Sequence, residues 1–131
     1  MRTTALDIIA ISETKLYNNS NYNEIQLPGY TFVSKNSLTQ VGGVGIYVKI
    51  NLIYKIRSEL DLHNDHIEDI WVEVTDVNNT SFLVGALYSH PNNNTNHFGE
   101  IFENSINILN MESKLFTCLS ISILMLYLIT L

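Results

Sequence analysis

The chain begins with a series of short β-type segments, and this pattern restricts the fold more than any other feature of the sequence. Each segment is an apolar or alternating run that ends in turn-forming residues, as the strands of a sheet do. The segments are Ile8–Ile11 and residues 30–35, 44–50, 52–57, 69–74 and 81–88. The first is apolar at every position, which predicts a strand covered on both faces. The last two are separated by "DVNNT", so we expect them to form an antiparallel hairpin.

The periodicity changes after residue 97. Apolar side chains then recur at intervals of three and four residues, which predicts an amphipathic helix. They are Phe98, Ile101, Phe102, Ile106 and Leu109, and Asn94–Asn96 offer side chains that can cap the helix. Many short strands followed by one helix predict an α/β (α+β) fold, a mixed sandwich in which most strands are antiparallel.

Composition narrows the class of protein further. The 131 residues suffice for one domain, and 46% of them are apolar while 15% are charged, which excludes a disordered acidic chain. The net charge of −6 argues against nonspecific electrostatic binding of nucleic acid. The one cysteine, Cys118, excludes an internal disulfide framework and a cysteine-rich zinc site.

Neither end of the chain indicates export or a membrane. The N-terminal apolar run is interrupted by Asp7 and lacks the core of a signal peptide, so we expect that the chain is not secreted. The glycosylation triplets at Asn18, Asn78 and Asn93 are then unused. Leu115–Leu131 carry no charge, yet they are a little short for a membrane span and only one lysine flanks them.

Glu13 is the first candidate for chemistry, because it lies where the apolar run Ile8–Ile11 ends. A half-buried carboxylate needs a hydrogen bond, a cation or a metal. Tyr88 and Asn92 lie at the end of the last strand segment, where a phenol and an amide could meet a ligand. Taken alone, each of these positions is more often structural, as an exposed loop acid or as part of a turn.

Two further patterns favour structural explanations. The "GGVG" at residues 42–45 lacks the lysine and the strand-to-helix context of a phosphate-binding loop, so we interpret its glycines as the entry to a strand beside a close backbone. A cluster of histidines and acids in residues 61–68 could hold a metal, but a solvated polar loop explains it better. Its members are Asp61, His63, Asp65, His66 and Glu68.

Taken together, the segments resemble one family. "DIIAISETKL", "LPGYTFVSKNS", "GGVGIYVK", "IEDIWVEV" and "FLVGALYSHPNNN" occur in its order and spacing. The chain resembles the endonuclease/exonuclease/phosphatase superfamily and, within it, the apurinic/apyrimidinic-endonuclease-like domain of non-LTR retrotransposons. The resemblance covers residues 5–112 and implies a fragment of a four-layer α-β-β-α sandwich.

The resemblance implies a site and a reaction. The family's "ET" glutamate, here Glu13, ends a strand and binds a divalent ion, usually Mg²⁺, which takes few carboxylates and keeps several waters. Tyr88 matches a tyrosine near the scissile phosphate, and Asn92 matches an asparagine that follows the nearby proline. The implied function is Mg²⁺-dependent hydrolysis of DNA phosphodiesters as part of a retrotransposon polyprotein, which implies a nuclear location.

The sequence also departs from the family. Neither the strand that carries an asparagine before the "ET" motif, nor "GDFN", nor the terminal "SDH" occurs. Ser89 and His90 follow the tyrosine where the family commonly has arginine or alanine. We therefore expect a fragment of the endonuclease domain with little or no activity, because catalytic groups that act as a unit fail together. We also expect poor solubility from exposed sheet edges.

The apolar tail, residues 113–131, has two interpretations. One choice of codons for Ser120–Leu126, read in a shifted frame, encodes Asp-Phe-Asn, so we interpret the tail as frameshifted or non-native sequence that follows a partial domain at residues 1–112. The alternative function is that of a non-catalytic small protein, held at a membrane through Leu115–Leu131.

Overall fold

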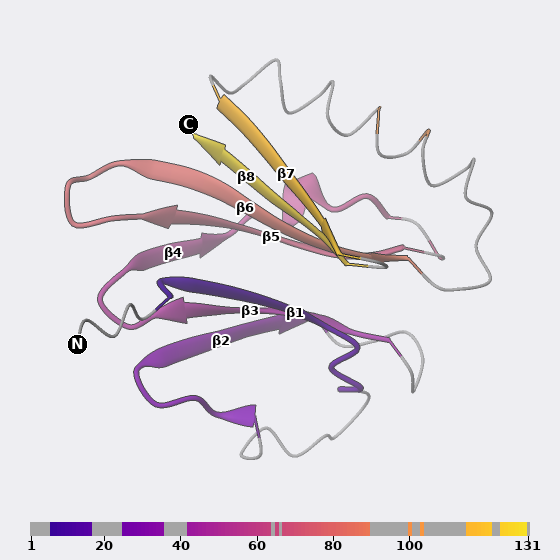
Figure 1. The fold of residues 1–131 in the computed structure, drawn as a ribbon, viewed down its shortest axis with the longest axis horizontal. Helices are drawn as coiled ribbons and strands as arrows, with labels where there is room; N and C mark the ends of the chain where they lie inside the picture. Colours follow the sequence, from indigo (N-terminus) through magenta and orange to yellow (C-terminus); the bar gives the residue numbers. More distant parts are fainter. Residues whose placement is uncertain are drawn as a thin grey trace.

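The computed structural model describes residues 6–16, 25–35, 42–63, 65, 67–89, 100, 103, 115–121 and 124–130. The elements are β1 (Ile8–Ser12), β2 (Tyr30–Lys35), β3 (Val44–Lys49), β4 (Ile53–Ile56), the short 3-10 helix η2 (Ser58–Leu60), β5 (Ile67–Thr75), β6 (Ser81–Ser89), β7 (Leu115–Ile121) and β8 (Leu124–Thr130). The strands form two sheets, in the orders β1-β3-β2 and β4-β5-β6-β8-β7, and each of these pairs is antiparallel. Figure 1 shows the two sheets as two layers.

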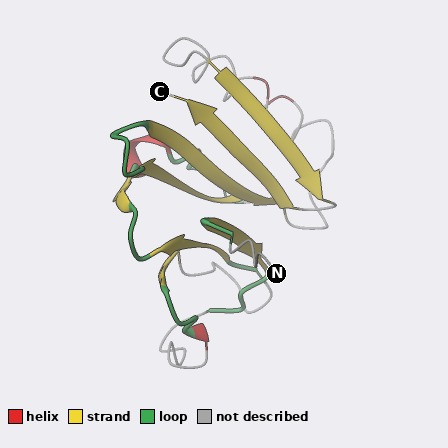
Figure 2. Ribbon diagram, turned by 60° about the vertical axis from the view of Figure 1, so that its left-hand side comes forward, coloured by secondary structure: helices red, strands yellow, loops and turns green. Residues whose placement is uncertain are grey.

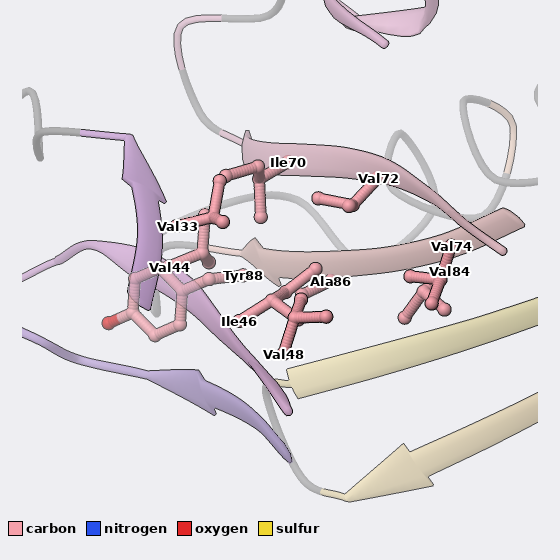
Figure 3. Packing of buried hydrophobic residues seen from close by; sticks show 10 residues of the cluster. All are labelled: Val33, Val44, Ile46, Val48, Ile70, Val72, Val74, Val84, Ala86 and Tyr88. Carbon is pink, nitrogen blue, oxygen red and sulfur yellow. The ribbon is translucent and has the colours of Figure 1, made fainter. Parts of the chain in front are cut away.

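The core lies between the two sheets, because alternate residues of the facing strands point inward. Most of its members are β-branched, which suits a pleated surface. They are Val33, Val44, Ile46 and Val48 from the three-stranded sheet and Ile70, Val72, Val74, Val84, Ala86 and Tyr88 from the five-stranded sheet. In Figure 3, Tyr88 lies at one side of this cluster and its hydroxyl points away from it.

The predicted hairpin of β5 and β6 is confirmed. The two strands pair along nine residues each. In the connecting turn, Asp76 Oδ1 accepts the backbone N–H groups of Asn78 and Thr80, each at 2.9 Å. The register places Glu68 opposite Tyr88 and Trp71 opposite Gly85. Because successive side chains alternate between faces, the first pair lies toward the three-stranded sheet and the second lies on the other face.

A buried carboxylate lies on that other face. Asp69 is 1% exposed, and its Oδ2 accepts the Trp71 Nε1–H at 2.7 Å and the Leu62 N–H at 3.0 Å. The Nζ of Lys35 lies 3.8 Å from the other carboxylate oxygen and 2.9 Å from Asp61. These contacts tie the end of β2 and the segment before β5 to the face of the hairpin that carries Trp71.

Asp69 predicts a pH dependence of stability. Burial raises the pKa of Asp69, although the hydrogen bonds from Leu62 and Trp71 and the charge of Lys35 oppose the shift. The proton is therefore bound more tightly in the folded chain than in the unfolded chain, where the pKa is about 3.9. This contribution to stability is fully present below the unfolded value and is lost as the pH rises through the raised pKa.

We therefore expect Asp69→Asn to flatten the fall in the free energy of unfolding that begins as the pH rises above about 3.9. The amide oxygen of the variant can still accept hydrogen bonds from Trp71 and Leu62. Urea denaturation over a pH series measures the effect. Equal slopes in the wild type and the variant would show that Asp69 does not titrate in this range.

Within the described part of the chain β1 pairs only with β3, which places it at an edge of its sheet. All five of its residues are partly buried, so the predicted cover on both faces is present only in part. Ile8 and Ala10 pack against the core, whereas Ile9 and Ile11 point to the opposite face. The apolar run Ile8–Ile11 therefore predicts a strand correctly but does not predict its position in the sheet.

The structure confirms the predicted α+β class, with mainly antiparallel strands. Most of the predicted helix falls outside the described residues, although Glu100 and Glu103 are helical. The further layers of a four-layer sandwich stay a prediction. The strands β1 to β6 correspond to the segments predicted between residues 8 and 88, whereas β7 and β8 were not predicted.

The apolar tail contributes two strands to the larger sheet. β8 pairs with β6 from Phe82↔Thr130 to Tyr88↔Leu124, and β7 pairs with β8 (Figure 2). No helix in the described ranges is long and apolar enough to span a membrane. The proposed domain boundary at residue 112 and the non-native origin of the tail stay predictions.

Candidate metal and phosphate site

Five residues from both sheets meet at one end of the sandwich, and we call them the strand-end site. They are Glu13, Thr14, Gly43, Glu68 and Tyr88. Antiparallel pairing explains the meeting: Ser12 at the end of β1 lies opposite Val44 at the start of β3, and Glu68 near the start of β5 lies opposite Tyr88 near the end of β6. Stacking of the two sheets then brings the two sets of strand ends together.

The backbone after β1 turns sharply at Glu13. Glu13 has a φ of 54° and Lys15 a φ of 55°. This left-handed conformation costs a non-glycine residue roughly 1–2 kcal/mol. It is held by the Lys15 N–H, which donates to the Gly42 carbonyl at 2.8 Å. His63 and Asn79 adopt the same left-handed conformation in other turns, so the strain alone does not distinguish Glu13 from an ordinary turn residue.

Gly43 makes this turn possible. Its φ of 109° favours glycine, and a Cβ at this position would lie 2.1 Å from Thr14 Oγ1. A Cβ on Gly45 would likewise lie 2.4 Å from the ring of Phe32. The prediction that these glycines enter a strand is thus confirmed, but the atoms that come closest to Gly43 and Gly45 belong to the side chains of Thr14 and Phe32 and not to a neighbouring backbone.

Glu68 is a buried acid at the base of the site. It is 5% exposed, and its Oε2 accepts the Gly43 N–H at 3.0 Å. The prediction of a solvated polar loop is therefore wrong for Glu68, which belongs to β5. It holds for His63 and Asp65, which are exposed, while Asp61 is paired with Lys35.

Tyr88 lies close to both Glu13 and Glu68. The residue is 2% exposed, and burial raises the pKa of its phenol. The charges of Glu13 and Glu68 raise the pKa further, as does the hydrogen bond between the Tyr88 side chain and Glu13. The phenol therefore stays protonated at neutral pH, and it acts as a hydrogen-bond donor and not as a nucleophile.

The residues of the strand-end site suit a single hard cation with few protein ligands. Mg²⁺ is commonly bound through one or two carboxylates and keeps several waters. Glu13 supplies an exposed carboxylate, and beside it the buried Thr14 Oγ1 has no hydrogen-bond partner within the described residues. The described ranges contain no group of three or more His, Cys, Asp or Glu that could hold a metal.

The structure brings together two of the three residues predicted for the site. Glu13 is exposed, as the simpler interpretation has it, but its carboxylate also contacts Tyr88. Asn92 lies outside the described residues. Glu68 and Thr14 were not predicted for the site; the register of the hairpin, which pairs Glu68 with Tyr88, is the signal that could have found the first.

Comparison of the chain with known protein families, with curated proteins and with solved structures finds no match.

Proposed function

We propose that the chain carries part of the active site of a metal-dependent DNA endonuclease and has little or no activity alone. One observation supports this most: Glu13 and Tyr88 are far apart in the sequence and come from different sheets, yet their side chains are hydrogen-bonded at one end of the sandwich. A carboxylate that is oriented by a protonated phenol can serve as a ligand of a cation.

The charge of the site explains why a cation is needed. Glu13 and Glu68 both lie near the Tyr88 hydroxyl, and the whole chain has a net charge of −6. A phosphodiester approaching two carboxylates is repelled unless a cation intervenes. Bound through Glu13, Mg²⁺ would supply positive charge that polarises the phosphate. The single O–H of Tyr88 donates to Glu13 in the structure, so it could donate to a non-bridging phosphate oxygen only when Glu13 turns toward the bound ion.

The same residues explain the low activity that we expect. Tyr88 is held protonated by its surroundings, so it cannot act as the base that activates water. The sequence contains neither "GDFN" nor "SDH", which the resemblance assigns to positioning water and phosphate. Binding of metal and phosphate is therefore proposed to survive without efficient hydrolysis.

A binding assay and a nicking assay on the full chain test this proposal. We expect a short DNA oligonucleotide to be retained in Mg²⁺ and released by chelator. Glu13→Ala should lose this Mg²⁺ dependence, whereas Glu73→Ala, which removes an acid paired with Arg57, should keep it. Supercoiled plasmid should be nicked at no more than a trace rate. Retention that depends on neither Mg²⁺ nor Glu13 would contradict the proposed site, and robust nicking that Glu13→Ala abolishes would contradict the low activity.

A further inference from the structure

Glu68 is a buried carboxylate that the proposed reaction does not use directly. A carboxylate that is 5% exposed must be stabilised by hydrogen bonds, because burial of an unpaired charge is costly. The Gly43 N–H meets this need, donating to Glu68 Oε2 at 3.0 Å. A hydrogen bond between an amide and an ionised carboxylate is stronger than one between neutral groups. The contact therefore fixes where the Gly42–Gly43 segment lies.

That segment in turn fixes the turn at Glu13. The carbonyl of Gly42 accepts the Lys15 N–H at 2.8 Å, and the carbonyl of Gly43 accepts the Thr14 N–H at 3.4 Å. Thr14 lies so close to Gly43 that no side chain fits between them. The two residues that follow Glu13 are thus held by backbone hydrogen bonds to Gly42 and Gly43, and Glu68 binds the second of these glycines.

A role as a second metal ligand fits Glu68 less well. Its Oε2 is already occupied by the Gly43 amide, and only a small part of the residue is exposed. Glu13 is exposed and stands at the outer side of the same turn. The two acids therefore have different surroundings, and only that of Glu13 is open to a hydrated ion.

We propose, resting on the metal site assigned to Glu13 above, that Glu68 is the positioning residue of that site: by binding the Gly43 amide it sets the direction of the Glu13 carboxylate. Residues that hold a metal ligand in place without touching the metal commonly act in this way, and their loss costs about 10–100-fold in metal affinity.

Two conservative variants separate this role from the others. Glu68→Gln removes the charge and keeps an oxygen that can accept the Gly43 N–H. Glu68→Asp keeps the charge and withdraws the oxygen by one methylene. We expect Glu68→Asp to weaken Mn²⁺ binding about tenfold, because it loses the hydrogen bond from the Gly43 N–H. Glu68→Gln keeps that hydrogen bond and should stay within about threefold of the wild type. The affinity is measured on the full chain from the electron paramagnetic resonance signal of free Mn²⁺.

A second readout needs no metal. Amide hydrogen exchange at Gly43 and Lys15 should become at least about tenfold faster in Glu68→Asp, because each loses a protecting hydrogen bond, and should stay slow in Glu68→Gln. A larger loss of Mn²⁺ affinity in Glu68→Gln than in Glu68→Asp would show that the charge of Glu68, and not its positioning of Gly43, controls binding. Unchanged affinity in both variants would overturn the proposal. If the wild type binds no Mn²⁺, the metal site fails, and unchanged exchange in Glu68→Asp then overturns the positioning role on its own.

Discussion

Gly85→Val is expected to destabilise the chain by about 3 kcal/mol or more, the upper range for overpacking of a well-packed interior. A Cβ on Gly85 would lie 2.2 Å from the Trp71 ring, which is 1% exposed. The ring cannot swing away easily, because its Nε1–H donates to the buried carboxylate of Asp69 at 2.7 Å. Total stabilities of small domains are about 5–15 kcal/mol, so this one change removes a large share. Urea denaturation followed by circular dichroism measures the loss.

Two controls show whether the Trp71 ring is the cause. Gly29→Ala adds a Cβ with no heavy atom within 4 Å, and its φ of 86° makes the change cost only about 1–2 kcal/mol of backbone strain. In a Trp71→Leu background, Gly85→Val should cost less than it does in the wild type, because residues in contact are not additive. An equal cost in both backgrounds would show that the two residues do not pack as they do in the structure.

Glu13→Gln is expected to reduce Mn²⁺ affinity by more than about a hundredfold. Loss of the metal ligand itself should have a larger effect than loss of a residue that only positions the ligand, such as Glu68. The amide keeps the size and the hydrogen-bonding oxygen of the side chain, so the contact with Tyr88 can persist while the charge that binds the cation is gone. The measurement is the titration of free Mn²⁺ by electron paramagnetic resonance.

The matched control for Glu13 is another exposed glutamate. Glu59 has a side chain that is 58% exposed and is paired with Arg57. Glu59→Gln should leave the Mn²⁺ affinity unchanged. Comparable losses in the two variants would mean that Mn²⁺ is attracted by the overall negative charge, and equal affinity in Glu13→Gln and the wild type would remove Glu13 from the site.

The strands could be predicted from the sequence because each one carries its own local signal. Alternation and turn residues located β2, β3 and β4, and "DVNNT" located the hairpin of β5 and β6. The place of a strand within a sheet has no such signal. The apolar run of β1 predicts a strand but not its position in the sheet. The order β1-β3-β2 of the described strands depends on pairing between residues far apart in the sequence.

The candidate site was predictable only in part. Glu13 and Tyr88 were proposed from the resemblance, because a lone acid or tyrosine at a strand end is more often structural. Glu68 looked like one of several acids in a polar loop, and its role depends on the sheet register and on an amide of Gly43, neither of which a motif records. The left-handed turn at Glu13 is likewise a product of packing against residues 42–43.

Paramagnetic broadening of the nuclear magnetic resonance spectrum by Mn²⁺ tests the central claim most directly, since the ion broadens the signals of nuclei close to it. The strand-end site predicts early loss of the signals of the Glu13 and Gly43 amides and of the Tyr88 ring. The amides of Val77 and Asn79, in the turn at the other end of the hairpin, should persist, and Glu13→Gln should abolish the selective loss. Broadening that is uniform over the chain, or strongest at the opposite turn, would contradict the account.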